Sequence, residues 1–366
     1  MTHSTPVLLA AGTYTRTMPH VDGKGAGLHL LEFDPASAEL REVHVTGGLD
    51  NPSYLDLSAD HSRLYSVREV GAELQPGIDV FELQTESPAL RHLQRVETPG
   101  EWPCHIMASP AGDLLAVANY LSGEVVVLAL NKSGLVQGEP VVLRRTGQGP
   151  NEERQEGPHA HCARLSPDGR HLYLTDLGVD QVLRHLVIDG RVQTTPDLVL
   201  PTVPGQGPRH IAFTPSGKHM LVNYELSSSL ALFRLHENGD VARLGEVSTL
   251  PADFRGDSGD GGLRVHPSGR FVYVGNRGHD SVFAARLDEE KGCLIPIDCW
   301  PAGGRTPRDL AITPDGGHLL CASQDDALIR IFRIDPQSGA LQQTGQDYPI
   351  NNVVCLRFVA PTGASS

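Results

Sequence analysis

The sequence predicts an all-β fold, a seven-bladed β-propeller, and three observations support this prediction. A turn phrase of the form Ser/Thr/His-Pro-x-Gly lies between two apolar segments and recurs along the chain. Its spacing suits one four-stranded blade per unit. Long helical periodicity is absent, and 39 glycines with 27 prolines argue against helices.

The repeated turn sets the length of each unit. Complete copies end at Gly112, Gly169, Gly217, Gly269 and Gly316, so they lie 57, 48, 52 and 47 residues apart. Proline presets φ for the first corner of such a turn, and glycine accepts the positive φ that closes it. Each turn is therefore predicted to join a first and a second strand. A third strand follows, at residues 124–130, 181–188, 229–235, 281–287 and 327–334, and a weaker fourth completes the unit.

The two ends of the chain are predicted to share one blade. Six whole units begin near Ser53, His105, His161, His210, Gly262 and Asp309. Residues 353–359 look like a first strand without a successor, and residues 7–11 and 27–33 look like second and third strands without a predecessor. Pairing these fragments closes the ring and removes open sheet edges. The whole chain, residues 1–366, is thus predicted to be a single domain.

Composition excludes several classes of partner. The net charge of −14 argues against a basic nucleic-acid-binding face. No segment approaches the roughly 18 consecutive apolar residues of a membrane-spanning helix. Residues 1–6 lack the basic start and apolar run of a signal peptide, so a cytoplasmic protein is expected. The six cysteines form no Cys-x-x-Cys pair and are expected to be buried free thiols.

Blade geometry predicts where chemistry can gather. Because the first two strands of a blade are antiparallel, the start of the first and the end of the second lie at the same end, opposite the hairpin. Polar residues of every whole unit, though not of the shared blade, converge there: Arg68, Glu69, His105, Asn119, Tyr120, His159, His161, Asp176, Asp180, Arg209, His210, Glu225, Asn276, Arg277, Arg308, Gln324 and Asp325. Convergent ionisable groups favour a functional site at this mouth of the channel. In so acidic a chain, an anionic ligand needs such a local cluster of Arg and His.

The same residues carry a family resemblance. Short phrases ordered along nearly the whole chain include Pro103-Cys-His105, Gly157-Pro-His-Ala-His161, Gly207-Pro-Arg-His210, Glu225-Leu226 and Asn276-Arg-Gly278. With them the chain resembles the lactonase-type seven-bladed propellers, which include a bacterial 6-phosphogluconolactonase and the fungal carboxymuconate cyclase. The resemblance implies His161, Arg209 and Glu225 as catalytic residues and Arg277 as a further site arginine. One departure is Tyr224, which separates Asn223 from Glu225.

These residue types suit lactone hydrolysis. His161 would accept a proton from water, Arg209 would polarise the carbonyl, and Glu225 would orient either of them or return a proton to the opened ring. Arg277 would hold an anionic tail, with Arg308 as a further candidate. His105, His159, His210, Asn119 and Asp176 are the other expected substrate-binding residues. No metal or cofactor is expected, since His159 and His161 have no third ligand nearby in the sequence.

Several alternatives stay open. The preferred activity is hydrolysis of 6-phosphogluconolactone in pentose phosphate metabolism, and the alternative enzyme is a carboxymuconate-lactonising one. A non-catalytic binding platform would use exposed rim aromatics, for which only Tyr120, Tyr224 and Trp102 qualify. His161 could instead hold a loop, and Arg209 with Glu225 could be a structural ion pair. Residues 147–157 are either a lid or a long loop, and residues 256–262 are expected to be a mobile loop between blades. Oligomeric state is not predicted.

Overall fold

The computed structural model describes residues 6–359. The absence of a signal peptide was inferred mostly from residues 1–5, which lie outside this range. Within residues 6–359, no helix is long and apolar enough to cross a lipid bilayer. A single 3₁₀ turn, Ala72–Leu74, is the one helical element of this part of the chain.

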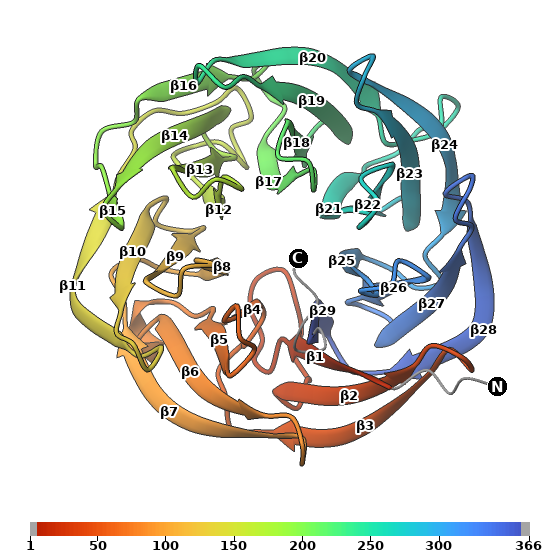
Figure 1. Ribbon diagram of the computed structural model, residues 1–366, viewed down its shortest axis with the longest axis horizontal. Helices are drawn as coiled ribbons and strands as arrows, with labels where there is room; N and C mark the ends of the chain where they lie inside the picture. The colour runs from red at the N-terminus through yellow and green to blue at the C-terminus, as the bar shows by residue number, and fades with distance from the viewer. Residues whose placement is uncertain (1–5, 360–366) are drawn as a thin grey trace.

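Seven antiparallel sheets surround a central channel, which confirms the predicted propeller (Figure 1). The strands next to the channel are β4 (Leu55–Leu57), β8 (Pro103–Ala108), β12 (Ala160–Leu165), β17 (Pro208–Phe213), β21 (Gly259–Val265), β25 (Pro307–Ile312) and β29 (Val353–Val359). The second strands are β5 (Arg63–Arg68), β9 (Leu114–Asn119), β13 (His171–Asp176), β18 (His219–Tyr224), β22 (Phe271–Arg277), β26 (His318–Ser323) and β1 (Val7–Thr13).

The third and fourth strands build the outside of the ring. The third strands are β6 (Gly77–Gln84), β10 (Val125–Leu130), β14 (Gln181–Ile188), β19 (Ser229–Leu235), β23 (Ser281–Asp288), β27 (Leu328–Ile334) and β2 (Leu28–Asp34). The outermost strands are β7 (Ala89–Glu97), β11 (Val136–Leu143), β16 (Leu198–Pro201), β20 (Val241–Ser248), β24 (Cys293–Pro301), β28 (Leu341–Pro349) and β3 (Glu39–Thr46). A short extra strand, β15 (Arg191–Val192), also pairs with β14.

The shared blade closes the ring as predicted. Strand β29 pairs antiparallel with β1, with Ala10 opposite Arg357, and β1 continues into β2 and β3. The last strand of the described chain thus lies innermost in the blade that the N-terminal strands complete. This arrangement pairs the inner edge of β1, which would otherwise be an open sheet edge.

Two sequence-based expectations need correction. Residues 259–262, expected to belong to a mobile loop, form the start of the channel-side strand β21, with Asp260 paired opposite Asn276. Glycine is required here, since a Cβ on Gly261 would lie 2.5 Å from the carbonyl oxygen of Pro307. The expectation of buried cysteines is also wrong for Cys293 and Cys299, which are only partly buried, although all six thiols are free.

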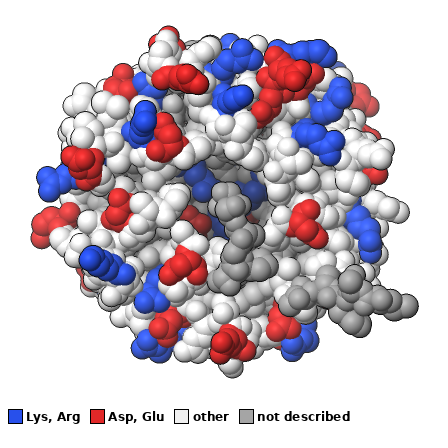
Figure 2. All heavy atoms as spheres, viewed as in Figure 1, with Lys and Arg blue, Asp and Glu red and all other residues white. Residues whose placement is uncertain are grey.

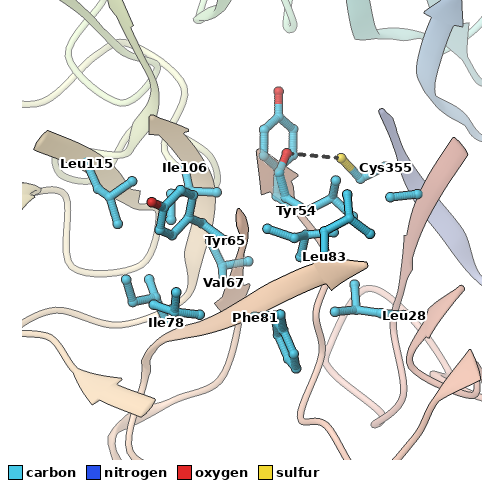
Figure 3. Packing of buried hydrophobic residues seen from close by; sticks show 14 of the residues in the cluster. Leu28, Tyr54, Tyr65, Val67, Ile78, Phe81, Leu83, Ile106, Leu115 and Cys355 are labelled. Atoms are coloured by element: carbon cyan, nitrogen blue, oxygen red, sulfur yellow. Dashed lines mark hydrogen bonds between the residues drawn. The ribbon is translucent and has the colours of Figure 1, made fainter. Parts of the chain in front are cut away.

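Apolar side chains between neighbouring blades hold the ring together. The largest cluster joins residues of several blades, among them Tyr65, Phe81 and Ile106, and all three are at most 1% exposed (Figure 3). Outer strands such as β7 consist mostly of exposed and partly buried residues instead. The stability of the fold therefore depends on packing between blades as much as on pairing within them.

Replacing Phe81 by alanine is expected to destabilise the protein by about 3–5 kcal/mol, because it empties a fully buried ring-sized volume. The midpoint of urea denaturation measures this change. Phe254→Ala is a matched control, since Phe254 lies partly buried in a loop and should cost much less. Equal midpoints for the two variants would contradict the role given to inter-blade packing.

Candidate active site

A repeated backbone irregularity places side chains at the channel mouth. In five blades the channel-side strand carries one extra residue near its start, and the pairing register shifts around it. The extra residues are Cys104, His161, Arg209, Arg308 and, in the shared blade, Val354. Three of these strands begin with proline, which is tolerated at the first position of a strand. Such bulges redirect side chains and are common beside active sites.

A cavity of about 470 Å³ lies at this mouth, within the usual size range of small-molecule sites. It is lined by Pro19, His20, Glu69, Trp102, Cys104, Tyr120, Leu121, Glu153, Arg154, Glu156, His159, His161, Glu225, Arg277 and Arg308. Two other hollows, of about 520 and 470 Å³, lie at the hairpin ends and are lined by turn residues such as Ser216 and Arg270. The mouth cavity differs from these two because four buried acidic and imidazole side chains line it together, namely Glu69, His159, His161 and Glu225.

Glu225 is the centre of a buried charge cluster. Its Oε1 accepts a hydrogen bond from Nη2 of Arg154 at 2.6 Å. Its Oε2 lies 3.0 Å from Nε of Arg209 and 2.8 Å from Nη2 of Arg277. Burial alone would raise the pKa of Glu225, but Arg277, Arg154 and Arg209 together lower it well below its ordinary value. Glu225 is therefore a carboxylate at neutral pH and cannot supply a proton.

His161 is a neutral imidazole beside this cluster. Its Nε2 lies 3.9 Å from Oε2 of Glu225, and the residue is 5% exposed. Burial lowers the pKa of His161 well below its usual range, and the Arg209 cation lowers it further, although Glu225 acts in the opposite sense. The imidazole is thus free to accept a proton at neutral pH.

The opposite side of the cavity carries a second polar group. The hydroxyl of Tyr14 lies 3.0 and 2.9 Å from the two carboxyl oxygens of Glu69, and Nη2 of Arg308 donates to that hydroxyl at 2.9 Å. Within residues 6–359, Arg308 forms no ion pair. The shared blade, expected to add nothing to the mouth, supplies Tyr14 and also His20, which lines the cavity.

The segment 147–157 covers part of the cavity. The buried residue Gln155 holds this segment in place, because its Nε2 donates a hydrogen bond to the carbonyl of Leu177 at 2.9 Å. Arg154, next in the chain, reaches inward to Glu225 and to the hydroxyl of Tyr120, which is 3.0 Å from its Nη2. The loop therefore contributes a cation to the cavity.

Comparison with known proteins agrees with this architecture. The family model described as "Lactonase, 7-bladed beta-propeller" matches residues 8–358. The chain belongs to this family. It is 30% identical over 349 residues to a 6-phosphogluconolactonase of Bacillus subtilis (95% of this chain, 97% of the relative), and 29% identical over 353 residues to one of Formosa agariphila (95% and 98%).

Solved structures of other members are closely similar. A putative 6-phosphogluconolactonase of Bacteroides fragilis superposes with a TM-score of 0.90 at 29% identity, covering 98% of this chain and 99% of that one. A periplasmic gluconolactonase of Pseudomonas aeruginosa superposes with a TM-score of 0.89 at 30% identity, covering 97% and 99%. The chain is therefore similar to lactonases along its whole described length.

Some residues predicted for the site of this lactonase-family protein lie one layer deeper. Arg209 is 3% exposed and does not line the cavity, because it packs behind Glu225 and donates from Nη1 to the carbonyl of Gly261 at 2.9 Å. His105 and His210 also lie outside the lining, with ring centroids 5.8 Å apart, and the His105 ring is 4.4 Å from that of Tyr54. In this conformation these three residues are positioned to support the site, not to contact a substrate.

Two other predicted binding residues face away from the cavity. Nδ2 of Asn119 donates to the carbonyls of Pro99 and Glu124 at 3.4 and 3.3 Å. Oδ1 of Asp176 accepts from the backbone N–H of His159 at 2.8 Å, and burial raises the pKa of Asp176 to about 6. Both side chains hold backbone in place and are not among the residues that line the cavity, so their role in substrate binding stays a prediction. His159 and Arg277 do line the cavity, as expected.

The prediction from sequence missed Arg154, His20 and Tyr14 as site residues. Arg154 belongs to the segment 147–157, expected to be a lid or a long loop, and Tyr14 lies in Gly12-Thr-Tyr-Thr15, another of the short phrases that resemble the lactonase-type propellers, so each carried a weak signal. His20 carried none, since it comes from an irregular segment after β1. Among residues 6–359, no three His, Cys, Asp or Glu side chains are arranged to hold a metal ion.

Charge is distributed unevenly around the ring. Figure 2 shows the face opposite the mouth, where β1 begins and β29 ends, and basic side chains are visible inside its central hollow, while acidic and basic groups are scattered over the surrounding surface. At the mouth cavity, Arg154, Arg209 and Arg277 contact the ionised Glu225, Arg308 lies on the opposite side, and the exposed Glu153 and Glu156 belong to the lining. The interior of an acidic protein thus offers an environment that favours an anion.

Proposed function

We propose that this protein hydrolyses an anionic sugar lactone, with 6-phosphogluconolactone as its substrate. The observation that carries the proposal is a neutral His161 beside the Glu225–arginine cluster in one cavity. Lactone hydrolysis needs a base for water and a cation for the developing oxyanion. The names of several relatives support the same reaction class.

The geometry suggests a role for each group. His161 takes a proton from the attacking water, and Arg277, which lines the cavity, stabilises the oxyanion that forms on the carbonyl. Glu225 holds Arg277 at 2.8 Å and faces His161. Arg209 acts through Glu225 as a positioning residue, a change from the direct contact with the carbonyl that the sequence predicts.

Arg308 is the proposed partner of the phosphate. It lines the cavity, forms no ion pair within residues 6–359, and occupies in its blade the bulge position that Arg209 occupies in another. A guanidinium matches the oxygens of a phosphate. His159, stacked on Tyr120 with ring centroids 4.5 Å apart, forms the adjoining wall.

Arg308→Met should raise KM for 6-phosphogluconolactone by about 10–100-fold, since a charged hydrogen bond contributes about 1.5–3 kcal/mol. For gluconolactone, which lacks the phosphate, kcat/KM should change by much less. Initial rates on both substrates measure the difference, and Arg308→Lys, which keeps the charge, is the control. The same loss on both lactones would contradict phosphate recognition by Arg308.

The competing proposals make different predictions. A carboxymuconate-lactonising enzyme would use the same arginines for a carboxylate, and would not prefer the phosphorylated lactone. A binding platform has less support, because Tyr224, one of its three candidate aromatics, is fully buried. The cytoplasmic location stays a prediction, as one similar solved protein is described as periplasmic.

A direct assay tests the function. Purified protein should open 6-phosphogluconolactone faster than the spontaneous reaction, with a rate proportional to protein concentration and higher kcat/KM than for gluconolactone. Absence of any acceleration on either lactone would contradict the proposal. Acceleration of carboxymuconate lactone chemistry alone would favour the alternative enzyme.

A further inference from the structure

Glu69 and Glu225 occupy the same position in two different blades. Each directly follows a second strand, β5 or β18. The backbone N–H of each donates to a carbonyl just before the channel-side strand of its own blade, that of Asn51 for Glu69 at 3.1 Å and that of Gly207 for Glu225 at 2.8 Å. The blades lie across the channel from one another (Figure 1). Both residues are 3% exposed and both line the cavity.

The surroundings of these two carboxyl groups differ in charge. Three arginines contact Glu225 at 2.6–3.0 Å. Glu69 instead contacts hydroxyl groups, those of Tyr14 and Ser53, and forms no ion pair within residues 6–359. One carboxyl group is therefore held by cations and the other by neutral donors.

This difference separates their protonation. Burial raises the pKa of Glu69, and this effect outweighs the opposing effects of Arg308, Ser53, Tyr14 and Arg209. For Glu225 the arginines outweigh burial and lower the pKa. Cys104 and His20 also face this side of the cavity: burial raises the pKa of the Cys104 thiol, whereas His20 is exposed and its Nε2 lies 3.3 Å from the hydroxyl of Tyr14. Two carboxyl groups whose pKa values are shifted in opposite directions are typical of a pair in which one group acts as an acid and the other stays ionised.

The proposed reaction needs a proton donor for the ring oxygen, and Glu69 is the buried carboxyl group of the cavity lining whose pKa is raised. The ring oxygen must gain a proton as it leaves, and Glu225 is ionised. We propose that Glu69 is the general acid, a catalytic residue that protonates the ring oxygen of the lactone. This inference rests on the proposed hydrolytic function.

The proton and bond balance closes with solvent alone. Water adds to the carbonyl carbon as His161 takes one of its protons. The bond from that carbon to the ring oxygen then breaks, and the Glu69 proton moves to the ring oxygen, which becomes a hydroxyl. His161 releases its proton to solvent, Glu69 regains one from solvent, and the new carboxylic acid ionises.

Glu69→Gln separates an acid from a structural acceptor. Glutamine keeps the shape and an acceptor for Tyr14 but has no proton to give. We expect kcat to fall by about 10²–10⁴-fold with KM changed by less than about threefold. Wild-type kcat/KM should fall as pH rises through the raised pKa of Glu69, and this alkaline limb should vanish in Glu69→Gln. Glu69→Asp, which still titrates, should restore the limb at a lower rate.

The dependence of kcat/KM on pH, measured from about pH 5 to pH 9, decides whether Glu69 is the general acid. An active Glu69→Gln variant, or one that keeps the alkaline limb, would overturn the acid role and leave the hydrolytic function standing. An inactive wild-type protein would overturn the function itself, and the acid role with it. If Glu69→Gln fails to fold, as judged by its melting temperature, the wild-type profile decides, because the absence of an alkaline limb below pH 9 would exclude the acid.

Discussion

Glu225→Gln is expected to lose both stability and activity. The substitution removes the negative charge that Arg154, Arg209 and Arg277 share, and leaves a buried Arg209 without a counter-charge. Breaking a buried ion pair on one side costs about 3–5 kcal/mol. Activity should fall by at least about 10²-fold, since Arg277 would lose the partner that orients it. Urea denaturation and initial rates measure the two effects.

The pH dependence of stability and two further variants test whether the charge of Glu225 causes these losses. The lowered pKa means that Glu225 contributes its stabilisation above its unfolded pKa, about 4.3, and loses it as pH falls through the folded value. The double variant Glu225→Gln/Arg209→Met should recover part of the stability and none of the activity. Arg154→Met, whose side chain is 41% exposed, should cost about 0–1 kcal/mol. A Glu225→Gln variant as stable as the wild type would refute the charge-cluster account.

His161→Ala is expected to lower kcat/KM by about 10²–10⁴-fold, because it removes the proposed general base. The wild-type profile carries a second signature. A base works when it is unprotonated, so activity should be full above the pKa of His161 and fall as pH drops through it. Burial lowers that pKa, so the acid limb should lie well below pH 6.5.

His236→Ala is the matched control, since His236 lies exposed in an outer turn. It should leave the rate and its pH profile unchanged. An acid limb centred near pH 6.5 in the wild type would indicate a solvent-exposed histidine and contradict the assignment. So would a His161→Ala variant that opens the lactone at the wild-type rate.

The ring could be predicted from the sequence because its turns are local. Pro-x-Gly phrases such as 167–169 and 267–269 specify hairpins from a few residues, and their spacing counts the blades. Closure of the ring could be predicted because the strand-like fragments at the two ends of the chain complete one blade when they pair. The start of β21 was missed because its glycine-rich residues look like a loop, and their need to pack against the next blade is a tertiary requirement.

The position of the candidate site could be predicted from the sequence, but the contacts of its individual side chains could not. Asn119 ends strand β9 and binds backbone carbonyls, while Tyr120, one residue later, lies in the turn after the strand and lines the cavity. The bulge that directs His161 inward and places Arg209 behind Glu225 depends on the backbone register between strands. Arg154 and His20 come from irregular segments whose paths no periodic pattern describes.

A crystal structure with bound 6-phosphogluconate tests the central claim most directly, because it shows whether one cavity holds both ends of the product. We predict the carboxylate between His161 and Arg277 and the phosphate against Arg308. A product bound elsewhere, for example in the hollow beside Ser216 and Arg270, would contradict the assignment of the channel mouth as the active site.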